Sequence, residues 1–412
     1  MQLAPCRTSR YDAAAMLIRC LSPLSLMWLT MALRAVGLWV VKGGATMAGE
    51  GTQGSRRRYD GERLSAFVTG IFEAVGMSAA LAATNARILV DADIRGIDSH
   101  GVPRLPGYIA AIRAGQIDVN ATPTIAHETA ATARVDGRNG FGLSNAEFAM
   151  DLAIKKAREA GVGFVSLGQT NHFGAASYYS LRALPHDLIG IAMTNAGGLV
   201  IPTFAREPLM GTNPLSVAVP SGAEQPFVID MATSTVAWGK VEIARRDEKL
   251  IPFGWAVDAE GDPTQDPFAA RYLLPLGGDR ATGSQKGYGL AMVVETLCGP
   301  LSGAALSFDQ RTYRPEPGTV STRPANAGQF FGAWDPAAFR PLEEYRADVD
   351  RLVSTLRNAT PAEGFERVYV PGDQEFAAEA ERRQEGIPLH PKVVEDLEVL
   401  ARSCKLTFDA AR

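Results

Sequence analysis

The residues best suited to chemistry stand in one short loop of the sequence. Ser99 and His100 are neighbours there, and Arg104 follows four residues after the histidine. A histidine transfers protons near neutral pH because its ordinary pKa is about 6.5, and an adjacent hydroxyl can relay that proton. The fork of an arginine binds a carboxylate through two parallel hydrogen bonds. The loop therefore predicts proton transfer on a small carboxylate-bearing molecule, although a lone loop histidine is more often simply solvated.

A second group of small and polar residues follows the strand-like run GVGFVSLGQT. His172 begins it, and the segment to Ala176 opens a helical pattern, where free backbone N–H groups receive phosphates or other anions. The alternative is that His172 only caps the helix. Thr212 and the segment 230–232 lie where strand-like runs are interrupted or end, and α/β enzymes place ligands at such points. These positions predict a site assembled from distant segments.

The sequence motifs of several other common chemistries are absent. The five histidines include no HExxH pair and the four cysteines no CxxC pair, so no metal site is expected. The glycines between 137 and 142 have GxxGxG spacing instead of the GxGxxG fingerprint. No GKS or GKT follows the glycines near 278, and no GxSxG elbow is present. A Walker ATPase and a serine hydrolase are therefore excluded, and a Rossmann dinucleotide site is not predicted.

The composition fits a soluble enzyme in a reducing compartment. The chain has 412 residues, 46% of them apolar, and 41 Lys+Arg against 45 Asp+Glu give a formal charge of -4. That balance excludes disorder and a nucleic-acid-coating surface, and it favours small molecules as ligands. The length predicts two to three domains. Because the cysteines suggest no disulfide framework, we expect the cytoplasm.

The first 46 residues differ from the rest. The stretch 21–41 is apolar with one charge, Arg34, and it follows three arginines, a layout typical of a signal anchor. Arg34 and Pro23 oppose this interpretation. We favour translation from Met47, with residues 1–46 as a gene-start extension or disordered leader, and a membrane location is then not expected. An alternative function, from a different class of protein, is that of a membrane-anchored, non-catalytic binding protein.

Helical patterns at both ends flank a β-rich centre. Apolar residues recur at helical spacing between 59 and 90, where Gly76 and Ser78 separate two helices. The centre alternates β runs such as LIGIAMTNA, LSVAVP and FVIDMA with glycine and proline turns. The sequence therefore predicts a mixed α/β (α+β) fold. We expect a discontinuous helical domain of residues 56–120 and 330–408 and a sheet domain of residues 121–329.

Taken together, these segments resemble the type-2 malate/L-lactate dehydrogenase family, with its ureidoglycolate, sulfolactate and diketogulonate dehydrogenases and its piperideine-2-carboxylate reductases. The resemblance runs from about Arg58 to about Phe408 and rests on DADIRGIDSHGVPRLPGY, NHFGAASYY, GTNPLSVAVP, DMATSTVAWGKV, QKGYGLAMVVETL and PGDQEFAAEAERRQEGIPL. It implies an NAD- or NADP-dependent oxidoreductase of small 2-hydroxy and 2-oxo acids, a homodimer, and a non-Rossmann NAD(P)-binding β-rich domain. Within the same family, NADPH-dependent reduction of a cyclic imino acid is the alternative.

The resemblance also implies roles for individual residues. It makes His100 the acid/base in some members with Ser99 as its relay, whereas the ureidoglycolate enzymes use the histidine that matches His172. Arg104 would hold the substrate carboxylate, and Thr212 would also face the substrate. The cofactor-binding residues that it implies are His172, Phe173, Gly174, Ala175, Ala176, Asp230, Met231, Ala232, Pro371, Gly372 and Asp373.

Overall fold

Two amphipathic helices lead into the candidate site in this computed structural model, which describes residues 57–310 and 324–411. Helix α3 (Gly61–Ala74) begins at Asp60, whose carboxylate accepts hydrogen bonds from the N–H groups of the first turn. Gly76 adopts φ +94°, a conformation that favours glycine, and turns the chain into α4 (Ala79–Ile94). The two predicted helices and the break between them are therefore confirmed.

Most of the other helices lie on amphipathic runs of the sequence. Helix α6, for example, ends at Gly161, which takes the left-handed conformation expected of a residue that terminates a helix. The short helix α8 was not predicted. The bounds are α5 (Leu105–Arg113), α6 (Gly142–Ala160), α7 (Ala176–Leu181), α8 (Trp238–Arg246), α9 (Ser284–Ser302), α10 (Leu342–Arg357), α11 (Asp373–Glu385) and α12 (Pro391–Ser403), with 3-10 turns η2 (Val102–Arg104), η3 (Leu184–His186) and η4 (Pro336–Ala338).

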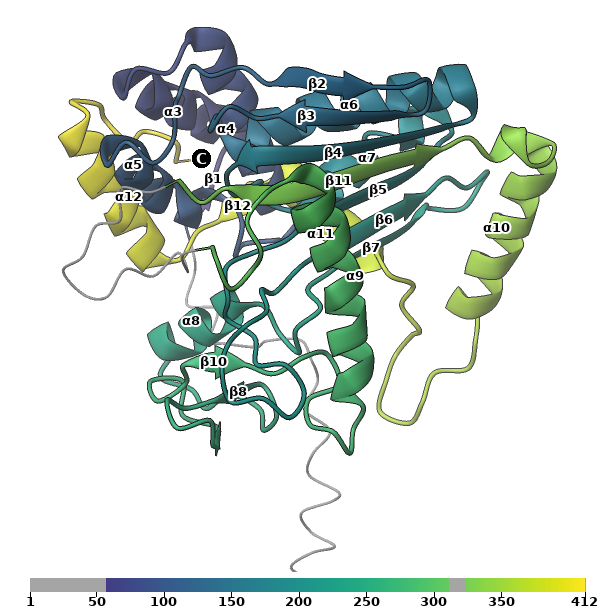
Figure 1. Ribbon diagram of the computed structural model, residues 1–412. Coiled ribbons are helices and arrows are strands. Elements are labelled where there is room, and N and C mark those ends of the chain that lie inside the picture. The colour runs from purple at the N-terminus through teal and green to yellow at the C-terminus, as the bar shows by residue number, and fades with distance from the viewer. Residues whose placement is uncertain (1–56, 311–323, 412) are drawn as a thin grey trace, which may run out of the picture. The chain divides into compact units, whose positions relative to one another are not determined.

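The largest sheet of the described residues has seven strands in the order β2-β3-β4-β11-β5-β6-β7 (Figure 1). Strands β3 and β4 pair in parallel, and every other neighbouring pair in this sheet is antiparallel. The strands are β2 (Thr124–Glu128), β3 (Thr132–Asp136), β4 (Val162–Thr170), β5 (Ile189–Thr194), β6 (Leu215–Val219), β7 (Phe227–Met231) and β11 (Ala327–Trp334). The predicted mixed α/β architecture is confirmed.

Helices cover both faces of this sheet. Gly163 of β4 packs against the α6 backbone, where a Cβ would lie 2.1 Å from the Ala153 carbonyl oxygen. Gly168 packs against α9, where a Cβ would lie 2.9 Å from the Ser302 carbonyl oxygen. Because side chains alternate along a strand, these positions lie on opposite faces. Helix α6 therefore covers one face and α9 the other, with α7 packed against β5 and β6 (Figure 1).

Strand β11 in the middle of the sheet is the main difference from the sequence-based expectation. It lies between β4 and β5, and its residues are buried from Ala327 to Ala333. Residues 330–334, expected in the helical domain, thus belong to the sheet. The division into a helical and a sheet domain otherwise remains a prediction.

The distant ends of the described chain meet in a two-stranded ladder. Strand β1 (Arg58–Tyr59) pairs with β12 (Ile387–Pro388), and Tyr59 also forms a bridge with Ala411. A separate small sheet contains β8 (Ala256–Val257), β9 (Pro263–Thr264) and β10 (Tyr272–Leu273). Within the described residues, no helix is both long and apolar enough to cross a membrane. The apolar stretch 21–41 and the predicted leader lie outside those residues.

Candidate active site

The loop that carries the first candidate residues is fixed at both ends. The buried Asp93 carboxylate accepts a hydrogen bond from the Val102 N–H at 2.7 Å. Gly101 leaves the space that this carboxylate needs, since a Cβ there would lie 2.0 Å from Asp93 Oδ1. Arg382 of α11 donates to the Asp93 carbonyl oxygen at 2.6 Å and to Asp98 Oδ1 at 2.5 Å. The loop is therefore tied both to its own helix and to the C-terminal part of the chain.

Ser99, His100 and Arg104 form one connected group on this loop. Ser99 Oγ and His100 Nδ1 are hydrogen-bonded at 2.8 Å, as the predicted relay requires. Arg104 Nε donates to the Ser99 carbonyl oxygen at 2.6 Å. This bond fixes the orientation of the guanidinium group. All three residues are half-buried, so most of their surface is covered while part of it stays accessible to a small molecule.

His172 joins this group from the end of β4. Its ring stacks on that of His100, with 5.6 Å between centroids and 14° between planes. His172 Nδ1 is hydrogen-bonded to the Tyr108 hydroxyl at 2.7 Å and accepts from the Gly174 N–H at 3.3 Å. The structure therefore brings the two candidate histidines, which are far apart in sequence, into contact, and it adds Tyr108, to which the sequence assigned no role.

Both histidines are neutral near pH 7. Burial, with a smaller effect from the positive charge of Arg104, lowers the pKa of His100 to about 3. Burial also holds the pKa of His172 well below its ordinary value, and the nearby His100 and Arg104 lower it further. A neutral imidazole has one lone pair and one N–H, so either ring can accept a proton or donate a hydrogen bond.

Helix α8 packs directly against this group. A Cβ on its buried Gly239 would lie 2.8 Å from Ser99 Cβ and 3.6 Å from Arg104 Nη2. Glycine therefore lets the helix approach the loop closely. The neighbouring Lys240 is exposed. No signal in the sequence marked Gly239, because its role depends on a contact between segments that are distant in the chain.

Thr212 lies beside one of the predicted cofactor segments. Its carbonyl oxygen accepts hydrogen bonds from the N–H of Thr233 at 2.9 Å and from Thr233 Oγ1 at 3.1 Å. Thr233 directly follows the segment 230–232 at the end of β7. The loop with Thr212 and the end of β7 are thus joined directly by hydrogen bonds.

A cavity of about 250 Å³ brings together three predicted cofactor residues: Asp230, Pro371 and Gly372. Asp230 Oδ2 accepts a hydrogen bond from the N–H of Ser177 at 2.8 Å. Arg95, which the sequence did not single out, also lines the cavity and is 4% exposed. The full lining is Arg95, Ser177, Val228, Ile229, Asp230, Tyr369, Val370, Pro371, Gly372, Gln374 and Glu375.

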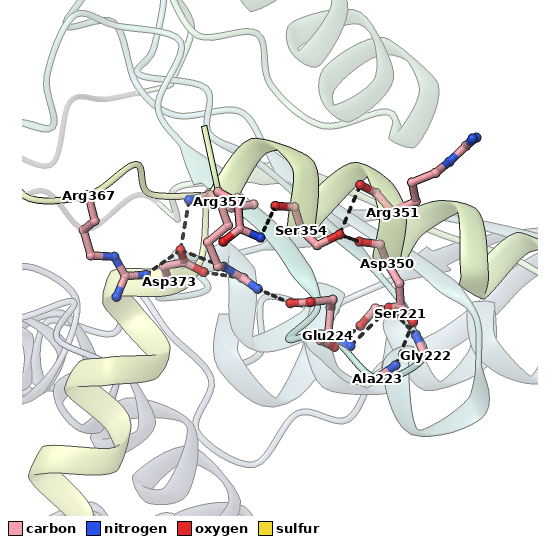
Figure 2. Close-up of polar contacts among 12 residues, drawn as sticks. Ser221, Gly222, Ala223, Glu224, Asp350, Arg351, Ser354, Arg357, Arg367 and Asp373 are labelled. Carbon is pink, nitrogen blue, oxygen red and sulfur yellow. Dashed lines mark hydrogen bonds and ion pairs between the residues drawn. The ribbon is translucent and has the colours of Figure 1, made fainter. Parts of the chain in front are cut away.

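Two of the predicted cofactor side chains have structural partners instead of facing this cavity. Phe173 is fully buried, and its ring stacks on Tyr179 at 5.1 Å between centroids. The Asp373 carboxylate, 4% exposed, is bound by Arg357 Nη2 at 2.7 Å, by Arg367 Nη2 at 3.2 Å and by the Val370 N–H at 3.0 Å (Figure 2). Asp373 therefore shapes the loop that borders the cavity.

The ion pairs of Asp373 continue into a network that attaches α10 to the sheet (Figure 2). Arg357 Nη1 donates to Glu224 Oε2 at 2.5 Å. The Asp350 carboxylate accepts from the N–H groups of Gly222, Ala223 and Glu224 in the turn after β6. Burial alone would raise the pKa of Asp373, but its bonds to Arg357 and to the Val370 N–H bring that pKa below the ordinary value.

Among residues 57–310 and 324–411, no three or more histidine, cysteine, aspartate or glutamate side chains are grouped so that they could hold a metal ion. The chemistry that these residues offer is proton transfer beside a fixed cation, and a separate cavity at the end of β7 has Arg95 and Asp230 in its lining. That arrangement is typical of an enzyme acting on a small organic anion.

Comparison with known proteins agrees with this description. Residues 59–398 match the family described as malate/L-lactate dehydrogenase. Malate dehydrogenase from Pyrococcus abyssi is 38% identical over 83% of this chain and 93% of its own length. Ureidoglycolate dehydrogenase (NAD(+)) from Escherichia coli O157:H7 is 36% identical over 78% and 88%, respectively. (2R)-3-sulfolactate dehydrogenase (NADP(+)) from Chromohalobacter salexigens is 34% identical over 80% and 94%.

Solved structures show the same fold. Malate dehydrogenase from Pyrococcus horikoshii superimposes with a TM-score of 0.77 at 34% identity, covering 85% of this chain and 96% of that one. Delta1-piperideine-2-carboxylate reductase from Pseudomonas syringae pvar. tomato gives a TM-score of 0.72 at 32% identity, covering 84% and 100%. The protein is thus an enzyme of the dehydrogenase class. It belongs to the malate/L-lactate dehydrogenase family, as the sequence motifs predicted.

Proposed function

We propose that this enzyme transfers a hydride between NAD or NADP and a small 2-hydroxy acid, interconverting it with the 2-oxo acid. The observation that carries the proposal is the group in which the His100 and His172 rings stack, while Ser99 is hydrogen-bonded to both His100 and Arg104. The relatives support it, since they are named for malate, ureidoglycolate and sulfolactate and for NAD(+) or NADP(+).

Arg104 binds the substrate carboxylate in this proposal. Its Nε is already bonded to the Ser99 carbonyl oxygen, so the two Nη atoms present a fixed pair of donors. A carboxylate bound there would fix the orientation of the carbinol carbon next to it. Thr212, on the loop beside β7, would contact the same substrate.

The contacts of the two histidines suggest different proton roles. An amide N–H can only donate, so His172 Nδ1, which accepts from the Gly174 N–H, carries a lone pair. The neutral ring then bears its proton on Nε2 and can donate a hydrogen bond to the substrate oxygen. His100 Nδ1 contacts a serine hydroxyl, which can accept, so His100 Nε2 can carry the lone pair. We therefore assign the acid/base to His100, with Ser99 as its relay.

Substrate binding would make His100 a better base. The positive charge of Arg104 contributes to its low pKa, and a bound carboxylate offsets that charge. The pKa of His100 would rise toward the range useful for proton transfer only when the anion is in place. Burial, the larger effect, would still keep the ring neutral until the substrate proton arrives.

The cavity between β7 and α11 fits part of a dinucleotide. Arg95 donates to Glu379 from Nη1 at 2.6 Å, whereas its buried Nε and Nη2 have no hydrogen-bond partner among the described residues. The Asp230 carboxylate adds hydrogen-bond acceptors to the cavity. Glycine at position 372 keeps space free, since a Cβ there would lie 3.2 Å from Val228. Of the predicted cofactor residues, Asp230, Pro371 and Gly372 line this cavity and would contact the dinucleotide, whereas Asp373 would hold the loop 371–373 in place. When bound, the nicotinamide ring supplies the hydride donor or acceptor.

The proposal is tested by two substitutions assayed at 340 nm with a panel of 2-hydroxy acids, 2-oxo acids and both cofactors. Arg104→Met removes a charge-assisted pair, so we expect the KM of the organic acid to rise about 30-fold or more while the Kd of NADH or NADPH stays within about twofold. Equal changes in both constants would refute the carboxylate role.

The proton roles are tested by comparing His100→Ala with His172→Ala. Loss of a general base lowers kcat by about 10²-fold or more, and we expect this for His100→Ala with cofactor binding retained. His172→Ala should cost less and should not shift the acidic limb of the pH profile for hydroxy-acid oxidation, which reports the pKa of the base. The reverse ranking would transfer the acid/base role to His172.

The two alternative functions are not favoured. Reduction of a cyclic imino acid would use the same histidine to protonate nitrogen, and one matched structure is a reductase of that kind. The curated relatives above are dehydrogenases at 34 to 38% identity, which favours hydroxy acids. A non-catalytic binding protein would not need the paired histidines beside Arg104.

We also propose a cytoplasmic homodimer with a non-Rossmann cofactor domain. The sheet supports the last point, because it has one parallel pair, β3 and β4, and not a parallel doubly wound order. Exposed apolar side chains on α9, Met292 at 48%, Val293 at 51% and Leu301 at 51%, support contact with a second copy. Light scattering of the protein and of Val293→Glu would test the assembly.

A further inference from the structure

Helix α9 carries a buried carboxylate whose hydrogen bonds connect the loop after β5 with the loop that contains Thr212. Glu295 is 8% exposed, and four hydrogen bonds reach it. Its Oε1 accepts from Asn195 Nδ2 at 3.1 Å and from the Ser307 N–H at 2.7 Å. Its Oε2 accepts from Asn213 Nδ2 at 2.8 Å and from the Ser307 hydroxyl.

The two asparagines fix the ends of two loops. Asn195 directly follows β5, and its Oδ1 accepts from the Gly328 N–H at 2.9 Å. Asn213 directly follows Thr212, adopts the unusual φ of +38°, and accepts from the Ala196 N–H at 3.1 Å. The Glu295 carboxylate thus binds both loops at once and holds Asn213 in a conformation that few residues adopt without support.

Only a carboxylate satisfies this set of partners. Both asparagine amides and the Ser307 N–H can only donate at these positions, and a carboxylate is the side chain that accepts at both oxygens. A buried carboxylate is costly unless such donors surround it. The cost of placing Glu295 here is offset by the position that it gives to the loops.

We propose that Glu295 is a positioning residue for substrate binding, which acts through Asn213 to hold Thr212 against the substrate. This inference rests on the proposed contact between Thr212 and the substrate. It predicts that the carboxylate affects binding of the organic acid more than binding of the cofactor.

The contacts make Glu295→Gln a selective perturbation. The new NH2 group must replace one oxygen. At Oε1 it would meet two obligate donors, whereas at Oε2 it would meet Asn213 Nδ2 and a hydroxyl that can turn to accept. The amide therefore takes the Oε2 position. The tether to Asn213 is lost, while those to Asn195 and the Ser307 N–H remain.

The experiment measures KM for the 2-oxo acid and Kd for NADH or NADPH by nicotinamide fluorescence. In Glu295→Gln one buried hydrogen bond is lost and two N–H donors face each other, so the KM of the organic acid should rise about tenfold. The Kd of the cofactor should stay within about twofold. In the double variant with Asn213→Asp, the amide can donate to the new carboxylate. We expect partial recovery, because the bond from Asn213 Nδ2 to the Ala291 carbonyl oxygen at 3.2 Å is lost.

Two further variants serve as a second test and as a control. Asn213→Gly tolerates the positive φ, removes the same tether and should reproduce the rise in KM even if Glu295→Gln fails to fold. Asn85→Ala removes another fully buried amide, which contacts Leu81 and Ser144, and should lower stability without changing the ratio of the two constants.

Equal shifts of both constants, or a shift in Asn85→Ala like that in Glu295→Gln, would overturn the positioning role. Thr212→Ala separates this failure from failure of the proposed substrate contact. If Thr212→Ala leaves KM unchanged, the assignment of Thr212 is wrong. If it raises KM while Glu295→Gln and Asn213→Gly do not, only the inference about Glu295 is wrong.

Discussion

The close approach of α8 to the loop of Ser99 gives a sharp prediction for Gly239→Ala. An added methyl group would lie 2.8 Å from Ser99 Cβ, a distance that real Cβ atoms do not show. Ser99 Cβ is attached directly to the main chain, so it cannot rotate away. Either α8 or the loop with His100 must move, and the geometry of the Ser99–His100 pair changes with it.

Two opposing effects set the magnitude for this substitution. Replacing a helical glycine by alanine stabilises by about 0.5 to 1 kcal/mol, while forcing a methyl group into a packed contact costs about 1 to 3 kcal/mol. We expect a net loss of about 1 to 2 kcal/mol in the free energy of unfolding, or a Tm lower by a few degrees. Because misplacement of about 1 Å at a catalytic group can cost about 10²-fold, kcat should fall at least about tenfold.

Gly70→Ala in α3 is the matched control. A Cβ at Gly70 would meet only Leu406 Cδ1 at 3.4 Å, an ordinary contact, so this variant should be slightly stabilised and fully active. Thermal unfolding and initial rates at 340 nm are measured for both variants. If Gly239→Ala keeps full activity and gains stability as Gly70→Ala does, α8 does not hold the Ser99 loop.

Two further predictions concern buried ionisable side chains. The pKa of His100 is about 3 in the folded protein and about 6.5 when unfolded, so the unfolded state binds more protons between these values and stability falls as the pH drops through that window. Urea unfolding is measured at pH 7.5 and 5.0. Between these two pH values, His100→Gln should lose less stability than the wild type, with a difference of up to about 1.4 kcal/mol per pH unit. Equal losses in the two proteins would contradict a buried His100 ring that stays neutral. Arg357→Met leaves the Asp373 carboxylate with a weaker set of partners, and it should cost about 2 kcal/mol and weaken NADH binding several-fold. Unchanged cofactor Kd by fluorescence would mean that the 371–373 loop does not depend on this pair.

Local patterns predicted α3 and α4 but not α8. The break at Gly76 and the end of α6 at Gly161 both follow from residues whose conformational preference is strong. Strand β11 was missed because α6 and α9 cover its two faces and β4 and β5 flank its edges. It therefore shows no alternation of polar and apolar residues, and a short buried run of this kind is ambiguous in sequence.

The candidate site was predictable where motif and chemistry agreed and not where it depends on distant contacts. Ser99, His100 and His172 lie together as the proposed chemistry needs. Tyr108 is a partner of His172 from 64 residues away, which no spacing rule reveals. The Arg357 that pairs with Asp373 comes from α10, so the part of Asp373 in supporting the loop was visible only in three dimensions.

The pairing of β1 with β12 has a consequence for how the enzyme acquires activity. Arg58 bonds the Gly386 carbonyl oxygen across 328 residues, and Arg382 reaches Asp98 across 284. The entropy of closing such loops grows only with the logarithm of their length, so the contacts are stable once made, but long separations slow their formation. During refolding, helical signal should therefore return before turnover does. Activity would appear only when α11 docks on the loop that carries His100.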